Sequence, residues 1–416
     1  MRRWPVPPFL PVGRGAGMNK SSPSRTPVPP LWLLTLVTFS GTLAMHIFVP
    51  ALPAAARDLG ASTATMQGAI SFYLVGLAVG QLFYGPVSDV YGRKPVLMVG
   101  LALYTGAGLV AALAPGAPLL IGARLVQALG GCAGLALGRA MVRDTAGPQE
   151  AAARLALLNL MVSAGPGLAP AVGGAITATL GWRAIFGALC LMGLCSILLC
   201  WWRLPETGRR VEGVSAARLI HDYAQLLRSP AFGGYALGGA CTTTSMYGFI
   251  AASPFIFVEE LHRPVTEVGL YLGIMILGLS AGSLLASRLV RHASIDRLMV
   301  GASAVGLLGA SVFLLVVLTG HLSVPLVVAP LVLVTLGCGV ASPMALTRAV
   351  GVNPALIGSA AGLYGFGQMA WGALCSALVG QGGDPALSAA LVLVGGGVLG
   401  QLSFFVAGRT DRRVAG

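Results

Sequence analysis

Charged side chains are scarce in this chain of 416 residues. Asp, Glu, Lys and Arg together make up 9% of it, whereas a soluble domain carries roughly 25%. Hydrophobic residues make up 56%, and the mean hydropathy is +0.83. This balance excludes an ordinary soluble protein. Because an apolar run of about 20 residues crosses a bilayer as a helix, the sequence predicts an all-α membrane protein with twelve transmembrane helices. The expected spans are 31–56, 66–89, 95–114, 118–140, 152–180, 184–202, 231–258, 266–287, 298–319, 323–347, 355–379 and 386–407.

Acidic residues are scarcer still, with 13 Asp and Glu against 26 Lys and Arg and a net charge of +13. Lys and Arg are retained on the cytoplasmic side of membrane proteins. With a cytoplasmic N-terminus, fifteen basic residues of the turns and the C-terminal tail lie inside, and only Arg57, Arg183 and Arg263 lie outside. The basic balance is therefore a topology signal with both termini cytoplasmic, and it does not indicate nucleic-acid binding.

The sequence also lacks the motifs of enzymes and metal proteins. Its seven cysteines all fall in apolar runs, with no CxxC and no histidine at ligand spacing, so they are interpreted as small buried residues. We find no Gly-rich phosphate loop, no nucleophile with a base, and no nucleotide domain for ATP-driven transport. The sequence predicts no enzyme activity, no cofactor and no metal.

The chain divides into two similar halves. Residues 1–30 are rich in Pro, Ser and Arg and are expected to form a disordered cytoplasmic tail, with Met1 and Met18 as alternative starts. The predicted parts that follow are a six-helix bundle over 31–202, a basic linker over 203–230, a second bundle over 231–407 and a tail over 408–416. An offset of about 200 residues aligns Pro50 with Pro254 and Arg143 with Arg348. Duplicated six-helix halves are a recurrent transporter plan, and two halves imply a cleft between them.

Small residues four apart allow close helix approach in membranes. Four such pairs occur on the expected helices two, five, eight and eleven: Gly76/Gly80, Ala169/Gly173, Gly278/Gly282 and Gly358/Gly362. We predict that these helices form the sliding seam between the halves, with ordinary helix packing as the alternative.

The second expected helix ends in GPVSDVYGRK, with Gly85, Asp89, Gly92, Arg93 and Lys94 at fixed spacing. Glycines permit a tight turn, Asp89 can accept hydrogen bonds from a helix N-terminus, and Arg93 can pair with a carboxylate. The stretch resembles the signature loop of the major facilitator superfamily. The alternative is that the basic pair only anchors the loop on the cytoplasmic side.

Further stretches resemble one branch of that superfamily. RLVQALGG carries Arg124 and Gln127, and the same helix ends in Arg143 and Asp144. The fifth helix contains GPGLAPAVGG, with Gly165, Pro166, Pro170, Gly173 and Gly174. Together with LPET and ASPFIFVEE, these stretches are similar to the bicyclomycin and chloramphenicol resistance family of drug:proton antiporters. The resemblance implies efflux of small amphiphilic compounds in exchange for protons, by alternating access, across a bacterial inner membrane. It also implies a gating latch formed by Asp89, Arg93 and Asp144.

One position departs from that family, which usually has an aspartate where this chain has His46. Thr35, Thr38, Thr42 and His46 share a helix face, and such a polar stripe points to a cavity or a neighbouring helix. Helix geometry puts His46 roughly 22 Å up the first helix, at the level expected for Arg124. The thirteen Asp and Glu residues fall at the ends of the expected helices, in loops or in tails. Because a buried cation needs a counter-charge, the sequence favours neutral or anionic substrates. His46 is predicted either to carry the coupling proton or to make a structural hydrogen bond only.

The second half offers polar and aromatic groups for loosely specific binding. Tyr364, Gln368 and Trp371 share a face of helix eleven, as Thr242, Ser245 and Phe249 do on helix seven, with plain helix packing as the alternative. The sequence therefore predicts a monomeric secondary transporter in the lipid bilayer that exports drug-like compounds against protons. A facilitator or importer of an anionic metabolite without proton exchange is the second interpretation.

Overall fold

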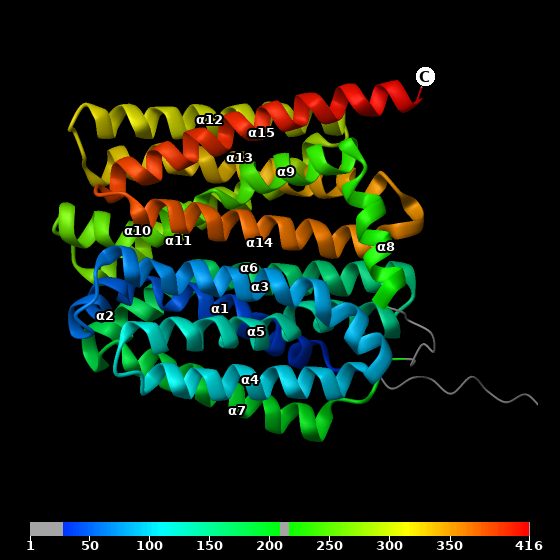
Figure 1. Ribbon diagram of the computed structural model, residues 1–416, viewed down its shortest axis with the longest axis horizontal. Coiled ribbons are helices and arrows are strands. Elements are labelled where there is room, and N and C mark those ends of the chain that lie inside the picture. Colours follow the sequence, from blue (N-terminus) through cyan, green and yellow to red (C-terminus); the bar gives the residue numbers. More distant parts are fainter. Residues whose placement is uncertain (1–27, 209–215, 416) are drawn as a thin grey trace, which may run out of the picture.

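The computed structural model describes residues 28–208 and 216–415, and all secondary structure in these ranges is helical (Figure 1). Most of the predicted tail over 1–30, including Met1 and Met18, lies outside the described residues, as do 209–215 of the linker. The helices are α1 (Leu31–Ile47), η1 (Val49–Ala51), α2 (Leu52–Asp58), α3 (Thr63–Tyr91), α4 (Arg93–Ala112), α5 (Ala117–Thr145), α6 (Pro148–Leu180), α7 (Arg183–Arg203), α8 (Ala216–Leu227), α9 (Pro230–Thr244), α10 (Met246–Phe255), η2 (Ile256–Glu260), α11 (Val265–Leu289), α12 (Ile295–Leu318), α13 (Val324–Gly351), η3 (Pro354–Leu356), α14 (Ile357–Gln381) and α15 (Pro385–Ala415).

Ten stretches of the described residues are long and apolar enough to cross a membrane. They comprise α1 with α2, α9 with α10 and η2, and eight single helices: α3, α4, α5, α7, α11, α12, α13 and α15. Each predicted span coincides with a long helix or a broken pair of helices to within a few residues at the start, because the hydrophobic periods and the polar turns mark these boundaries. The all-helical membrane architecture is confirmed.

Two predicted straight helices are broken in the structure. The span expected over 31–56 is interrupted at η1. Pro50 has no N–H group and so cannot donate the helical hydrogen bond to the carbonyl of His46. The span expected over 231–258 bends at Ser245, whose hydroxyl donates to the Cys241 carbonyl at 2.6 Å. Such bonding to the preceding turn often bends helices. Two of the predicted site residues, His46 and Ser245, therefore lie next to interruptions of the regular helical hydrogen bonding.

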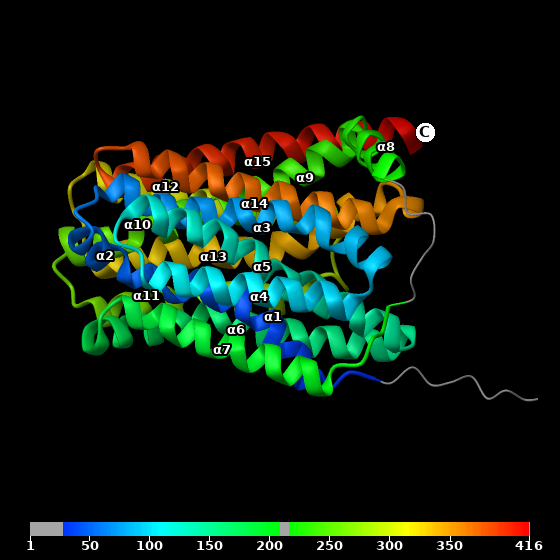
Figure 2. The same ribbon diagram turned by 60° about the horizontal axis from the view of Figure 1, so that its bottom comes forward.

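The helices form two groups that lie side by side (Figures 1 and 2). In the first group α1, α3 and α4 pack around α5, and in the second α9, α11 and α12 pack around α13. The groups meet through two helix pairs, α3 with α14 and α6 with α11. Figure 2 shows that α1 starts and α15 ends at the end of the bundle that carries α8. We name this the α8 end and the other the opposite end.

The predicted small-residue seam needs a correction at the level of residues. A Cβ on Gly76 would lie 2.5 Å from the Leu125 carbonyl of α5, and one on Gly80 would meet Cys132 at 2.6 Å. Gly278 and Gly282 likewise lie against Thr335 and Leu336 of α13. The four helices that carry the predicted pairs, α3, α6, α11 and α14, do meet between the groups, but these four glycines themselves allow close packing inside each group.

Other small residues occupy the seam itself. A Cβ on Gly269 of α11 would lie 2.3 Å from the Ala171 Cα of α6, next to Pro170, and one on Gly174 would lie 3.0 Å from the Val265 carbonyl. Gly362 faces the Gln81 carbonyl of α3 at 3.5 Å. The remaining predicted interface residues differ: Gly173 and Gly165 face Ile47 and Phe39 of α1, Ala169 is buried, and Gly358 has no neighbour within 4 Å.

Candidate functional site

Arg124 of α5 is completely buried in an aromatic box. Its guanidinium carbon lies 4.0 Å from the centre of the Tyr73 ring, 5.5 Å from that of Phe48 and 5.8 Å from that of Phe186. Tyr73 is held in turn because its hydroxyl donates to the Gly41 carbonyl at 2.7 Å. Aromatic ring faces attract a cation most strongly where water is excluded. The rings therefore stabilise a charge that has no ion pair within the described residues.

The hydrogen bonds of this arginine are incomplete. Arg124 Nη1 donates to Gln127 Oε1 at 2.7 Å, which brings together two predicted cavity residues. Within the described residues, Arg124 Nε, Arg124 Nη2 and Gln127 Nε2 are buried and have no acceptor. Buried donors without acceptors are costly. Arg124 and Gln127 thus hold three buried donor nitrogens without acceptors.

His46 lies beside this box and faces the second helix group. Its Nδ1 donates to the Thr42 carbonyl at 2.9 Å, since a carbonyl oxygen only accepts. The Nε2 atom has no hydrogen-bond partner among the described residues, so it can accept a proton while the Thr42 bond stays in place. The His46 ring is 6.4 Å from the Tyr247 ring of α10. His46 is therefore a titratable group at the boundary between the two groups.

The threonines of the polar stripe predicted on α1 also make hydrogen bonds within the first group. The Thr38 hydroxyl donates to the Leu34 carbonyl at 2.6 Å and lies 3.2 Å from the Gly134 carbonyl of α5. Thr42 donates to the Phe39 carbonyl at 3.0 Å. Thr38 thus joins α1 to α5, whereas His46, further along α1, lies next to Tyr247 of the second group.

Polar residues of α9 and α14 meet in the second group. Gln368 Nε2 donates to the Thr243 hydroxyl at 2.8 Å and lies 3.4 Å from the Tyr364 hydroxyl. Trp371 Nε1 donates to the Ser245 hydroxyl at 2.9 Å. The structure thus brings Tyr364, Gln368 and Trp371 of α14 against α9 and Ser245 through two separate sets of hydrogen bonds. Thr243, which the sequence reasoning missed, accepts the bond from Gln368.

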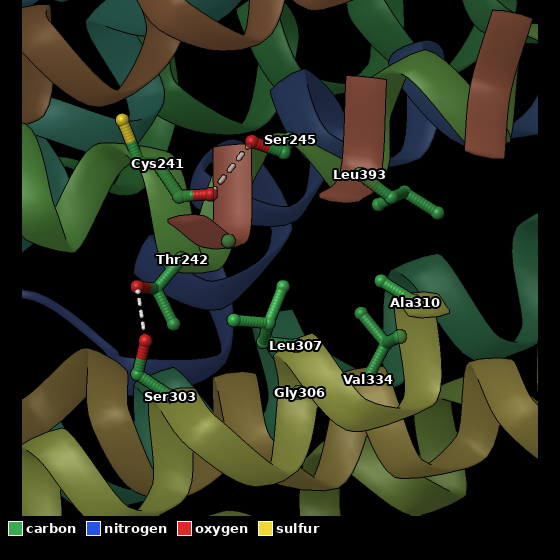
Figure 3. A pocket seen from close by; sticks show the side chains of 10 residues that line it. Cys241, Thr242, Ser245, Ser303, Gly306, Leu307, Ala310, Val334 and Leu393 are labelled. Atoms are coloured by element: carbon green, nitrogen blue, oxygen red, sulfur yellow. Dashed lines mark hydrogen bonds between the residues drawn. The ribbon is translucent and has the colours of Figure 1, made fainter. Parts of the chain in front are cut away.

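Thr242 lies in the interior of the second group, beside a pocket that Ser245 also lines (Figure 3). Its hydroxyl is 3.0 Å from the Ser303 hydroxyl of α12, beside a cavity of about 20 Å³ that is also lined by Leu307 and Val334. That volume holds about one water molecule. Thr242 and Thr243 thus face different neighbours, Ser303 of α12 and Gln368 of α14, because successive residues of a helix are about 100° apart. A place for Thr242 in the substrate cavity stays a prediction.

The predicted latch residues assemble at the α8 end. Arg93 Nη1 lies 2.7 Å from Asp89 Oδ1, and Arg93 Nε donates to Asp144 Oδ2 at 2.9 Å. Lys94 Nζ donates to the Trp201 carbonyl at 3.1 Å. Gly85 has no neighbour within 4 Å of a Cβ, and Arg143 is exposed. The partners that the structure gives Arg93 all belong to the first group.

The acid at the start of α4 is not the one predicted. Glu206, from the LPET stretch after α7, accepts hydrogen bonds from the N–H groups of Arg93 and Lys94 at 2.9 and 3.1 Å. Asp89 therefore pairs with a side chain instead of capping the helix. Gly92 has a φ of 97°, a conformation that favours glycine, and a Cβ there would lie 2.8 Å from Glu206 Oε2.

A model of the Major Facilitator Superfamily matches residues 34–376. The chain belongs to the Major Facilitator Superfamily. It is a transporter and not an enzyme, as the sequence predicts. Multidrug resistance protein D of Escherichia coli (strain K12) is 30% identical over 375 residues, which cover 89% of this chain and 91% of that protein. A bicyclomycin resistance protein homolog of Haemophilus influenzae is 25% identical over 353 residues, 84% of this chain and 88% of that protein. The predicted resemblance to the drug-resistance branch of the superfamily is confirmed.

Solved structures agree with the superfamily fold. A D-xylose-proton symporter superposes with a TM-score of 0.71 at 15% identity, covering 91% of this chain and 96% of that one. A bacterial homolog of the human lysosomal transporter Spinster gives a TM-score of 0.65 at 18% identity, covering 94% and 98%. At these identities the likeness concerns the fold alone.

Within this superfamily fold, polar contacts cross between the two groups near the ends of the bundle. At the opposite end, Arg57 Nη1 lies 3.8 Å from Glu259 Oε1, beside a cavity of about 180 Å³ lined by both groups. At the α8 end, the Tyr223 hydroxyl of α8 donates to the Leu82 carbonyl at 3.3 Å. Burial and the neighbouring Asp222 carboxylate raise the pKa of Tyr223, so its hydroxyl keeps the proton that it donates.

Proposed function

We propose that this chain exports neutral and anionic amphiphilic compounds from the cytoplasm, with neutral compounds exchanged for protons. The names of the similar proteins, multidrug resistance protein D and bicyclomycin resistance protein homolog, support export of drug-like compounds. The single observation that carries the charge preference is the fully buried Arg124, whose partners are aromatic rings and an amide. A cationic substrate beside it would meet a like charge in a dry site, which is unfavourable.

The proposed architecture has twelve spanning helices in two pseudo-symmetric six-helix bundles, over 31–202 and 231–407, joined by a linker over 203–230. The ten apolar stretches are supplemented by α6, with 33 residues, and α14, with 25. Both are long enough to cross the hydrocarbon core. The excess of Lys and Arg in the turns of the α8 end supports a cytoplasmic location for that end and for both termini. We expect one chain, in a bacterial inner membrane, to suffice for transport.

His46 is proposed as the proton carrier for neutral substrates. Its Nε2 is available for a proton or for an O–H or N–H of a substrate, but not for both at once. This competition is the requirement for exchange, because the site releases its proton when a substrate binds. An ordinary imidazole changes charge near pH 6.5, within the range of a cell. The structural alternative is that His46 serves only to hold Thr42.

Anionic substrates need no proton exchange in this scheme. A monoanion that leaves a cell whose interior is negative gains about 2.3 kcal/mol per 100 mV. The same physics supports a second candidate function, a facilitator of an anionic metabolite without proton coupling. The observation favouring it is that none of the thirteen acidic residues of the sequence falls in the middle of a predicted span.

The deciding experiment uses inverted membrane vesicles with an acidic lumen. We expect addition of the neutral compound 2-naphthamide to release protons from vesicles that contain the wild-type chain. H46Q is expected to abolish this proton release, while H292Q, an exposed histidine at the α8 end, leaves it intact. Undiminished proton release by H46Q contradicts the carrier role, and the absence of proton release by the wild type favours the facilitator.

A further inference from the structure

Three faces of α5 are covered by neighbouring helices. Gly130 lies against Tyr104 of α4, Gly134 lies against Val37 of α1, and Cys132 lies against Gly80 of α3. Arg124 projects from between the α1 and α3 faces. Arg139 follows fifteen residues later, which is about 22 Å along the helix and about 60° around it. The two arginines thus lie at different depths on neighbouring sides of one helix.

The amino-acid sequence alone did not indicate a role for Arg139. Its side chain is exposed to solvent near the α8 end of α5. In the described part of the chain it has no ion pair and no hydrogen-bond partner. Arg143, one turn on, is exposed as well, and like charges four apart on a helix repel each other. The α8 end of α5 therefore holds unneutralised positive charge.

The unused atoms of Arg124 define the ligand that it would accept. Nε and Nη2 are the two nitrogens of one edge of the guanidinium, and it is this edge that lacks an acceptor. Two parallel N–H bonds from one edge match the two oxygens of a carboxylate.

The same chain shows twice how this edge is used. Arg348 Nε and Nη2 donate to the two carboxylate oxygens of Asp296 at 2.8 and 2.6 Å. Arg263 Nε and Nη2 donate to the two oxygens of Glu267 at 2.8 and 3.0 Å. At Arg124 the corresponding edge is free, and the amide nitrogen of Gln127 adds a further unused donor.

We infer that α5 provides a two-step path for substrate carboxylates, in which Arg139 attracts the carboxylate at the α8 end and Arg124 with Gln127 binds it inside. The inference rests on the proposed function and names its anionic substrate class: amphiphiles with a carboxylate attached to an apolar body. The apolar body would lie against the aromatic box of Arg124. Arg139 acts on the rate of entry, because an accessible charge steers encounter. Arg124 acts on the lifetime of the complex, because a buried donor pair controls dissociation.

The experiment measures stopped-flow binding of 2-naphthoate and 2-naphthamide, which share a shape and differ in charge, to the purified full-length protein in detergent. R139Q is expected to lower the ratio of the naphthoate to the naphthamide association rate at least fivefold, and to flatten its dependence on salt. R203Q removes the same charge from the same end of the bundle on the peripheral helix α7, and we expect it to leave that ratio within twofold of wild type. R124K keeps the charge but removes the paired N–H edge, and it is expected to raise the naphthoate dissociation rate at least tenfold relative to that of naphthamide.

Three results would overturn the inference: equal binding of acid and amide by the wild type, an R139Q ratio equal to that of R203Q, or an unchanged relative dissociation rate in R124K. The wild-type comparison and its salt dependence need no variant, so they decide the matter even where R124K does not fold. Because binding is measured without a gradient, failure here is distinct from failure of the export proposal, which is tested by proton release and transport.

Discussion

Asp296 and Arg348 join the start of α12 to the end of α13 through two hydrogen bonds, and the corresponding junction of the first group has the opposite polarity. There, Arg93 starts α4 and Asp144 ends α5. An acid is favourable at a helix N-terminus and a base at a C-terminus, so the helix dipoles support the Asp296–Arg348 pair and oppose the Arg93–Asp144 pair. The first junction therefore depends on Glu206, which supplies the negative charge at the start of α4.

We predict that Glu206→Ala destabilises the first helix group. The change leaves the N–H groups of Arg93 and Lys94 without their acceptor, and loss of such a cap costs about 1 kcal/mol. Thermal unfolding in detergent should show a midpoint lower by about 2 °C. Glu150→Ala removes an exposed acid that pairs with Arg154 and serves as the control. Its unfolding midpoint should stay within about 1 °C of that of the wild type, because exposed ion pairs contribute little to stability. Equal midpoints for the two variants would mean that Glu206 does not cap α4.

Gly269→Ala is predicted to impair closure at the opposite end. The added Cβ would lie 2.3 Å from the Ala171 Cα, which is backbone and cannot rotate away, so α6 and α11 must separate. Accessibility of a cysteine introduced at Ala54, which lines the cavity between the groups, should rise severalfold in a maleimide labelling assay. Gly301→Ala in α12, where a Cβ meets nothing within 4 Å, is the matched control. A labelling rate equal to that of the control would contradict the role assigned to this contact.

His46→Asp is predicted to extend binding to cations. The carboxylate would supply the counter-charge that the buried site lacks, and a compensated charge is far less costly to bury. We expect affinity for a naphthylmethylammonium cation to rise at least tenfold and affinity for 2-naphthoate to fall. His46→Asn, which has a similar shape without the charge, separates the effect of charge from that of lost imidazole. Similar cation affinities in both variants would be evidence against the charge argument.

Tyr73→Leu is predicted to weaken the aromatic box more than Tyr73→Phe. Leucine removes the ring that lies 4.0 Å from the Arg124 guanidinium, and a desolvated contact of this kind is worth about 2 kcal/mol. Phenylalanine keeps the ring and loses only the hydrogen bond to Gly41, worth about 1 kcal/mol. Thermal midpoints in detergent should follow the order wild type, Tyr73→Phe, Tyr73→Leu. An inverted order would show that the hydroxyl, not the ring, stabilises the arginine.

Much of the fold follows from the sequence because apolar runs and polar turns mark the helices directly. Arg93 contacts Asp89 and Asp144, the partners that the family resemblance implied, and their role as a latch stays a prediction. The partners of individual glycines were not foreseen: Gly76 and Gly80 allow close approach on one side of α3, and periodicity does not say which neighbour covers that side. Thr242 and Thr243 illustrate the same difficulty on α9, where a shift of one residue changes the side.

The composition of the site depends on tertiary structure in the same way. Arg124 without an acid indicated an unusual partner, yet Tyr73 is one of several aromatic residues at a suitable depth, and only packing selects it. Arg139 looked like any basic residue near a helix end, because its exposure depends on how the neighbouring helices pack against α5. Glu206 lies more than a hundred residues from the helix that it caps, a separation that no local pattern bridges.

The most direct measurement of the central claim compares the affinity of the purified wild-type chain for three compounds of matched shape: 2-naphthamide, 2-naphthoate and 2-naphthylmethylammonium. The buried Arg124 without a carboxylate predicts measurable binding of the neutral and the anionic compound, each at least tenfold tighter than that of the cation. Tightest binding of the cation would contradict the account.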